Sequence, residues 1–393
     1  MVNELYKILL IVNFDHSYDK LSYYDDWVKA FVEHKRLKIK LINFTEIKSE
    51  SDKYDFIFLH HSTNADSIRP LLDIERYLED RKEEILIFIG NEFNNIFCPI
   101  GDRRKILKRM NVSYVCSQLM NQAAQFLWSD VAKKKVILSP PALNINNFFD
   151  QKKIINREFD IGFKGIKYYS YIGDTERNNM IERFSKIKKL NINIDFTRFD
   201  AKNWCIFLNS CKTVISSEAG SYFVDIDDKI IRDILRKIQN KTSKLIIPRS
   251  GFDKLFYTLP VFVKNFIKFF LKILPISHSN LVFEDAEYDK FYKSYFESLK
   301  KPKIYFKCIS SRNFDAIGTK TAQILLEGKY NNLLKPNIHY FSLKKDYSNF
   351  DEIIELVKNE KQVKKIAENA YDHVYSNHLY KHRIDYIIEE ITS

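Results

Sequence analysis

The sequence predicts an α/β protein made of two halves, each with a parallel sheet, and the two sheets face a shared cleft. Short, continuous apolar runs alternate with amphipathic stretches along the chain, which is typical of buried parallel strands separated by helices. A segment rich in Pro, Asn and charge, residues 139–158, interrupts this alternation as a linker would. The length of 393 residues also favours two domains.

Six apolar runs in the first 150 residues predict strands: 7–13, 38–44, 55–61, 85–90, 112–117 and 135–140. Amphipathic stretches such as 24–36 and 67–84 lie between them and predict helices. The first apolar run is too short and wrongly flanked for a signal peptide. We therefore expect an N-terminal Rossmann-like domain over residues 1–150.

The alternation restarts after the linker. The expected strands are 159–165, 191–197, 212–221, 244–250, 303–310, 322–328 and 338–343, and residues 349–390 are helical with charged faces. We assign a second Rossmann-like domain to residues 151–371. The last helix, about 372–393, is expected to return to the first domain. Ligands bind at the carboxyl ends of strands in such sheets.

Composition restricts the class of partner and the compartment. The net charge of +12 favours an anionic partner, although the charge is spread along the whole chain, as on an ordinary Lys-rich surface. The five cysteines are odd in number and none has metal-ligand spacing, so we expect reduced thiols, a cytoplasmic protein and no metal. Zinc-finger patterns and a concentrated basic stripe are missing from the sequence, and we expect no nucleic-acid partner.

Residues 260–275 form an apolar segment that carries a lysine at every fourth position. On a helix, Lys264, Lys268 and Lys272 would share one stripe, beside a face with Phe266, Phe269 and Phe270. The 14 residues between Pro260 and Pro275 would span roughly 21 Å as a helix. This length is less than the ~30 Å of a bilayer core. Either the segment lies in the surface of an anionic membrane, or it packs on the protein with its lysines in water.

The stretch 310–336 concentrates the groups that bind phosphate. Arg312 and Lys320 supply positive charge, Ser311, Thr319 and Thr321 supply hydroxyls, and a strand-to-helix turn would supply free N–H groups. Asp315 suits the hydroxyls of a ribose. No P-loop or dinucleotide fingerprint is present, and an ordinary capped helix is the alternative.

The run RNFDAIGTKTAQILLEGKYNNLLKP and the residues that follow to about 385 resemble the C-terminal half of GT-B glycosyltransferases. The bacterial group related to spore-maturation and O-antigen glycosyltransferases is the most similar. The resemblance implies a GT-B fold and a nucleotide-sugar donor, with Asp315 at the ribose and Gly318, Thr319, Lys320 and Thr321 beside the phosphates. Many relatives have an acid eight residues earlier, where this chain has Lys307.

Other polar residues follow expected strands. Glu218 follows an apolar run and is a candidate to meet a sugar hydroxyl or act as a base, and Gly220 and Ser221 beside it are assigned to the donor. The resemblance implies that the first domain, residues 1–150, binds the acceptor. Candidates on that side are Asp15, His16, His61 beside His60, and Glu92. Residues 225–228, DIDD, match an Asp-x-Asp metal pattern, but an acidic cap on a helix over 229–238 is the interpretation that we retain.

Together these features predict a glycosyltransferase. It would move a sugar from a nucleotide-sugar to a hydroxyl of a cell-surface glycan or its lipid-linked precursor, without a metal cofactor. The alternatives are a catalytically degenerate GT-B protein that binds glycan and a basic nucleic-acid-binding module. The protein is expected in the cytoplasm, with a peripheral contact to the inner face of the membrane as an option.

Overall fold

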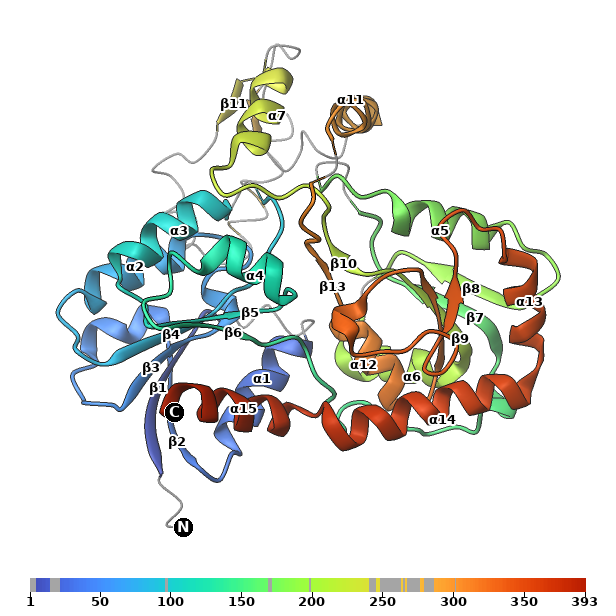
Figure 1. Cartoon of the computed structure of the whole chain (residues 1–393), viewed down its shortest axis with the longest axis horizontal. Helices are drawn as coiled ribbons and strands as arrows, with labels where there is room; N and C mark the ends of the chain where they lie inside the picture. Colours follow the sequence, from blue (N-terminus) through green and yellow to red (C-terminus); the bar gives the residue numbers. More distant parts are fainter. Residues whose placement is uncertain are drawn as a thin grey trace.

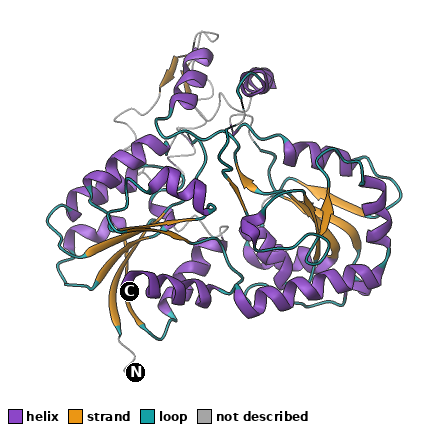
Figure 2. Cartoon of the chain, in the orientation of Figure 1, coloured by secondary structure: helices purple, strands orange, loops and turns teal. Residues whose placement is uncertain are grey.

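The computed structural model describes residues 5–14, 22–95, 98–168, 172–197, 199–239, 245–247, 263, 266, 276–278, 286–300 and 302–393. Two α/β domains lie side by side, and a smaller group of elements lies over the junction between them (Figure 1). Helices cover both faces of each sheet (Figure 2).

The first domain has a six-stranded, fully parallel sheet in the order β2-β1-β3-β4-β5-β6. Its strands are β1 (Tyr6–Val12), β2 (Leu37–Asn43), β3 (Phe56–Leu59), β4 (Glu84–Phe88), β5 (Tyr114–Ser117) and β6 (Lys135–Leu138). All six expected strands are present. β1, β3, β4 and β5 carry almost only apolar side chains, because both of their faces are covered.

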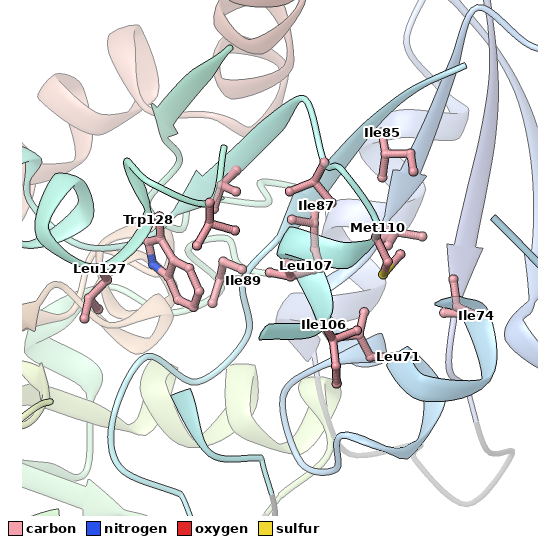
Figure 3. Close-up of a cluster of buried hydrophobic side chains, with 14 of the residues drawn as sticks. Leu71, Ile74, Ile85, Ile87, Ile89, Ile106, Leu107, Met110, Leu127 and Trp128 are labelled. Atoms are coloured by element: carbon pink, nitrogen blue, oxygen red, sulfur yellow. The ribbon is translucent and has the colours of Figure 1, made fainter. Parts of the chain in front are cut away.

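Helices pack on the two faces of this sheet. On one face lie α2 (Arg69–Leu78), α3 (Ile100–Arg109) and α4 (Asn121–Trp128), whose apolar side chains meet those of β4 around Trp128 and Ile106 (Figure 3). On the other face lie α1 (Ser22–Val32) and α15 (Tyr380–Thr392). The rings of Trp27 in α1 and Tyr380 pack edge to face, with 5.0 Å between their centroids. The last helix therefore belongs to the core of the first domain.

The second domain has a five-stranded parallel sheet in the order β15-β14-β9-β7-β8. Its strands are β7 (Phe159–Lys164), β8 (Ile192–Asp195), β9 (Cys211–Ser216), β14 (Ala322–Leu326) and β15 (Phe341–Leu343). Its helices are α5 (Glu176–Ser185), α6 (Ala201–Ser210), α12 (Ser311–Gly318), α13 (Phe350–Lys358) and α14 (Glu360–Asn377).

The described elements between β9 and α12 lie outside this sheet, near the junction of the two domains (Figure 1). They include β10 (Ala219–Gly220), α7 (Lys229–Gln239), β11 (Leu245–Ile247), β12 (Ile276–His278), α11 (Ala286–Glu297) and β13 (Lys307–Cys308). β10 and β13 form an antiparallel pair. Phe306 and Cys308 are buried in the same cluster as α2, α3 and α4, so this part of the chain joins the two domains. Short 3-10 turns span Phe44–Ser49, His61–Thr63, Ile154–Asn156 and Tyr330–Asn332.

The two other connections between the domains lie side by side. Leu143 of the linker pairs with Leu379, which joins α14 to α15. The Arg383 Nε donates to the carbonyl of Pro140 at 3.1 Å. Within the described residues, no helix is both long enough and apolar enough to cross a bilayer.

Candidate functional site

The strand order of the second sheet creates a crevice at its carboxyl edge. β7 and β9 are neighbours, but the chain leaves β7 toward β8 on one side and leaves β9 toward β14 on the other. Helices diverge at such a switch point and leave room for a ligand. A small cavity of about 20 Å³ lies there, between Lys164 at the end of β7 and Ser216 at the end of β9, with Arg177, Trp204 and Arg312 around it.

Arg312 enters the crevice from the first turn of α12. Ser310 caps this helix: its Oγ accepts from the Arg312 N–H at 3.4 Å, and its own N–H donates to Asn313 Oδ1 at 3.0 Å. The Arg312 guanidinium donates to the carbonyl of Lys164 and lies 5.2 Å from the Trp204 ring centroid. A Cβ on Gly165, whose φ is +153°, would come within 2.6 Å of Arg312 Nη1, so glycine is required there.

A second arginine comes from a second helix start. Arg177 is the second residue of α5, and its guanidinium lies 3.8 Å from the centroid of the Tyr168 ring. Lys164, by contrast, is committed to an ion pair with Asp195. The crevice therefore has two guanidinium groups and the N-terminal ends of two helices, α5 and α12. This combination suits an anion such as a diphosphate.

Asp315 lies one turn beyond Arg312 on α12 and is 5% exposed. Its Oδ2 accepts a hydrogen bond from Trp204 Nε1 at 3.0 Å. Burial raises the pKa of Asp315 to about 8, and the charge of Asp26 in the first domain acts in the same direction. Trp204 and Arg312 oppose this rise by stabilising the ionised form.

The turn at 318–321 differs from expectation. It follows helix α12 and precedes β14, so it is a helix-to-strand turn at the negative end of the helix dipole. Thr319 and Thr321 are buried, and Arg157 donates to the Thr319 carbonyl and the Thr321 hydroxyl, both at 2.7 Å. The Lys320 Nζ lies 4.8 Å from the Tyr371 ring centroid on α14. Of the stretch 310–321, the structure places only the first part at the crevice.

Gly318 is held by close packing. A Cβ at this position would lie 2.5 Å from Leu143 Cδ1 and 2.7 Å from the carbonyl oxygen of Phe148, both in the linker. The glycine therefore allows α12 to approach the linker.

Glu218 lies after β9 with both carboxylate oxygens engaged and 3% of its surface exposed. Its Oε1 accepts from the N–H groups of Lys329 and Tyr330 at 3.2 and 2.6 Å, and its Oε2 accepts from the Tyr305 hydroxyl. The carboxylate thus holds the loop after β14. Gly220 pairs with Lys307 in the β10–β13 ladder, and the buried Ser221 hydroxyl donates to the carbonyl of Ile172.

Lys307, at the position where the resemblance implies an acid in many relatives, lies in a buried ionic cluster. Its Nζ lies 2.9 Å from Asp174 Oδ2 and also contacts Glu176, and neither the Lys307 nor the Asp174 side chain is exposed. Lys345 joins Glu176 at 2.8 Å. Burial lowers the pKa of Lys307, but the two carboxylates outweigh this and raise it, so the lysine is charged. This cluster fixes the start of α5, where Arg177 lies.

Among the first-domain candidates, Glu92 is buried after β4. Its Oε1 accepts from Ser117 Oγ at 2.7 Å and Trp128 Nε1 at 2.8 Å, and its Oε2 accepts from the Gln118 N–H at 2.7 Å. Burial raises its pKa to about 7. Gln118 in turn accepts, at its carbonyl, a 2.9 Å hydrogen bond from Asn331 of the second domain. Glu92 thus supports a contact between the domains.

The histidine candidates are inside the domain. His60 and His61 are 0% and 1% exposed and lie among Tyr24, Trp27 and Phe88. Burial lowers the pKa of His60 to about 3 and that of His61 well below 6.5, so both are neutral. The structure therefore does not bring His61 to the surface of the cleft. Asp15 and His16 lie outside the described residues.

The acidic run 225–228 caps two helices. Asp225 accepts from the Ile230 N–H of α7 at 2.7 Å, and Asp228 accepts from the N–H groups of Gly101 and Asp102 in α3 at 2.9 and 3.2 Å. Across the described part of the chain, no group of three or more His, Cys, Asp or Glu side chains is arranged to hold a metal.

The predicted hydrophobic helix 260–275 lies outside the described residues except for Val263 and Phe266. Phe266 is helical and 64% exposed. The five other proposed contact residues, Lys264, Lys268, Phe269, Phe270 and Lys272, are not described.

Sequence reasoning missed Arg177, Trp204 and Asp26. Each is a single polar or aromatic residue on a helix, without a motif around it. The position of Arg177 in the sequence could have indicated it. It is the first basic residue of a helix that follows a predicted strand and loop, and such a residue lies at the carboxyl edge of the sheet.

Comparisons with known proteins agree with this architecture. A family model described as glycosyl transferase-like matches residues 277–389, less than a third of the chain. No curated protein matches the chain. Sucrose-phosphate synthase from Thermosynechococcus elongatus is 8% identical and matches with a TM-score of 0.54, covering 98% of this chain and 99% of that chain.

Two further solved structures resemble the whole chain. An alpha-glucosyltransferase in complex with UDP and DNA is 7% identical, with a TM-score of 0.52, and covers 99% of this chain and 100% of that chain. Anabaena HepE in complex with UDP and glucose is 8% identical, with a TM-score of 0.51 and the same coverage. At identities this low, the structural similarity establishes the fold alone, and that fold is GT-B. The predicted fold class and the resemblance to GT-B glycosyltransferases are confirmed.

Proposed function

We propose that this GT-B protein, whose C-terminal part is glycosyl transferase-like, moves a sugar from a nucleotide-sugar to a hydroxyl of a cell-surface glycan or its lipid-linked precursor. One observation carries the proposal. Arg177 and Arg312, from the first turns of two different helices, converge on the crevice between β7 and β9. This is the place where a parallel sheet binds a nucleotide.

The donor diphosphate would occupy the crevice. Arg312 is held in advance by the Lys164 carbonyl and the Trp204 ring, so little side-chain freedom is lost when an anion binds. Two helix N-termini add partial positive charge. These groups suffice in principle to neutralise a diphosphate, and we propose that the reaction needs no metal cofactor.

Asp315 would bind the ribose. Arg312 and Asp315 are three residues apart on α12 and therefore share one face of the helix. A diphosphate at Arg312 would bring the adjoining ribose hydroxyls toward the carboxyl of Asp315.

In the transfer step, the acceptor hydroxyl would attack the anomeric carbon while the bond from that carbon to the diphosphate oxygen breaks. Negative charge develops on the leaving nucleoside diphosphate, where the two arginines would stabilise it. We keep Asp15 and His16 as candidates for the group that takes the hydroxyl proton, since both follow β1 in sequence.

Two relatives guide the choice of donor. HepE was solved with UDP and glucose, and the alpha-glucosyltransferase was solved with UDP. We therefore propose a UDP-sugar as the first donor to test.

The acceptor proposal includes an anionic membrane surface. The net charge of +12 and the lysines at 264, 268 and 272 would attract a lipid-linked precursor at the inner face of the membrane. Changing Phe266, Phe269 and Phe270 to Ser should abolish sedimentation with vesicles that contain anionic lipid. Unchanged sedimentation of a folded variant would refute this part.

A thermal-shift screen against UDP, GDP, CMP and their sugar conjugates tests the donor site. A ligand at ~100 times its dissociation constant adds roughly 2.7 kcal/mol of stability. Stabilisation by one nucleotide family should be lost in Arg312→Ala and Arg177→Ala. The matched control is Arg76→Ala, which removes an exposed arginine from α2 in the first domain. No shift with any nucleotide would refute the proposal.

A degenerate GT-B protein that binds glycan without turnover is the second candidate. Lys307 favours this candidate, because it replaces an acid and its ammonium group is already paired with Asp174 and Glu176. Slow hydrolysis of the bound nucleotide-sugar, measured as release of free sugar, would decide for the transferase.

A further inference from the structure

The chain that leads into α5 is held by a segment that is distant in the sequence. Residues 172–176 form this approach, and Arg177 follows as the second residue of the helix. The contacts come from described residues of the junction segment, which we define as residues 217–310, between β9 and α12. The placement of Arg177 therefore depends on this segment as well as on its own helix.

The first half of the approach is held by a hydrogen bond and by packing. The buried Ser221 hydroxyl donates to the carbonyl of Ile172. Gly173 has a φ of +72°, and a Cβ on it would lie 2.8 Å from Phe296 and 3.0 Å from Phe223. The rings of Phe223 and Phe296 pack on each other, with 5.1 Å between their centroids. Glycine is therefore required at 173, and it brings the backbone against both rings.

The second half of the approach is held by charged groups. The Tyr222 hydroxyl donates to Glu176 Oε1 at 2.8 Å. The Lys307 Nζ lies 2.9 Å from Asp174 Oδ2 and also contacts Glu176. Lys345, which follows β15, is a further partner of Glu176. Because the Asp174 and Lys307 side chains have no exposed surface, neither can leave its partner without a large cost in free energy.

The junction segment is itself anchored on the first domain. The Asn94 Nδ2 donates to the carbonyl of Phe223 at 2.6 Å. Asp228 accepts from the N–H groups of Gly101 and Asp102, in the first turn of α3, at 2.9 and 3.2 Å. A support that is attached to both domains can hold the start of α5 in one position.

Arg177 is the residue that benefits from this support. Its guanidinium lies 3.8 Å from the centroid of the Tyr168 ring, and it makes no hydrogen bond or ion pair with any described residue. Its N–H donors are therefore available to an anion in the crevice. An arginine that is held in advance loses less conformational freedom when it binds a ligand.

We propose that the junction segment positions Arg177 for the donor, through the contacts of Ser221, Tyr222 and Lys307 with the approach to α5. The inference rests on the proposed function, in which Arg177 binds the donor diphosphate. Ser221, Tyr222 and Lys307 are positioning residues, because they touch the approach and act on the nucleotide through Arg177. Lys307 thus contributes to donor binding without touching the donor.

The test compares UDP affinity, measured by calorimetry, in the wild type and in a double variant with Ser221→Ala and Tyr222→Phe. The variant should fold, because Lys307 keeps both of its carboxylate partners. UDP should bind about 5- to 10-fold more weakly, since the start of α5 must then be ordered on binding. The matched control is Tyr295→Phe, which removes a hydroxyl that contacts Asp233 inside the junction segment at 3.4 Å and should leave UDP affinity unchanged.

The same two changes in an Arg177→Ala background show whether the effect passes through Arg177. They should then alter UDP affinity by less than about 1.5-fold, because residues that act through one another are not additive. An equal loss in both backgrounds overturns the proposal, since Ser221 and Tyr222 would then act on the nucleotide without Arg177. Unchanged UDP affinity in the folded double variant also overturns it. If the double variant does not fold, Tyr222→Phe alone takes its place, with an expected loss of about threefold.

Hydrogen exchange tests the positioning without nucleotide. The amides of residues 176–180 should exchange faster in the double variant than in the wild type, whereas those of α13 should exchange equally in both. Unchanged exchange at residues 176–180 overturns the proposal. Faster exchange there, in a protein whose wild type binds none of UDP, GDP or CMP, upholds the hold on α5 and refutes the donor site instead.

Discussion

The ammonium group of Lys307 lies 2.9 Å from the carboxylate of Asp174, and neither side chain has any exposed surface. One residue is in β13 and the other precedes α5, so the pair joins segments 133 positions apart. Both charges are buried away from water, so removal of either residue leaves the other as a buried charge without a partner.

Lys307→Met should therefore destabilise the protein by about 3–5 kcal/mol in urea unfolding. Lys186→Met is the control, because Lys186, at the end of α5, pairs with Glu182 on the surface and its loss should cost much less. Equal, small effects of both changes would show that the buried pair does not stabilise the fold. Combining Lys307→Met with Asp174→Asn should recover part of the loss.

Asn331 should stabilise the fold both through its backbone conformation and through its side-chain hydrogen bonds. Its φ is +54°, and its side chain joins the domains by donating to the Gln118 carbonyl at 2.9 Å and accepting from the Ile309 N–H at 2.8 Å. Asn331→Ala should cost about 2–3 kcal/mol from lost hydrogen bonds and backbone strain together. Asn331→Gly removes only the side-chain bonds and should recover about 1 kcal/mol. If both variants unfold alike, the backbone conformation contributes nothing.

Glu92 predicts a pH dependence of stability. Its pKa in the folded protein is about 7, above the ordinary 4.5. A raised carboxyl pKa gives stability that is fully present below pH 4.5 and is lost as the pH rises through 7. The loss should amount to roughly 3 kcal/mol.

Glu92→Gln should remove this dependence. The change in unfolding free energy between pH 5 and pH 8 should be smaller in the variant than in the wild type, while the exposed Glu46→Gln should behave like the wild type. An identical pH dependence in Glu92→Gln would mean that Glu92 ionises normally.

A substitution at Gly318 distinguishes a packing role of this residue from a role in ligand binding. Gly318→Ala should destabilise the protein by about 1–3 kcal/mol, because the new methyl group meets Leu143 and the backbone of Phe148. UDP affinity of the folded fraction should be unchanged. Shortening Leu143 to Ala in the same protein should relieve part of the strain. Normal stability with weak UDP binding would place Gly318 at the phosphates after all.

The predictable part of this molecule is the part that hydrophobic patterning controls. The strands of both sheets are continuous apolar runs, and runs such as 84–88 and 322–326 are recognisable because both faces of these strands are buried. Helix α12 was harder to recognise. With eight residues it is too short to show a clear helical period, so the strand-to-helix turn could not be located within 310–321, and residues 318–321 were assigned to the phosphates although they follow the helix.

The site itself depends on tertiary contacts that one sequence does not contain. Arg177 and Arg312 are 135 positions apart and meet only through the strand order. The ionic partners of Lys307 could not be inferred from spacing, because a buried lysine has the same local sequence as an exposed one. Asp315 was singled out by the phosphate-binding groups around it and by the resemblance, whereas Asp26 had no such signal.

The position of α15 affects the order of events on the ribosome. Residues 380–392 cover the apolar face of α1 with Ile384, Ile387 and Ile388, although the rest of that domain is encoded in the first 138 residues. During synthesis the first domain therefore emerges early but keeps Trp27 and Phe31 uncovered until the second domain has been translated. At a synthesis rate of ~5–20 residues per second, the nascent chain exposes this apolar surface for many seconds. Premature termination before residue 380 would thus damage the domain made first, and a chaperone that binds nascent chains should be found on α1.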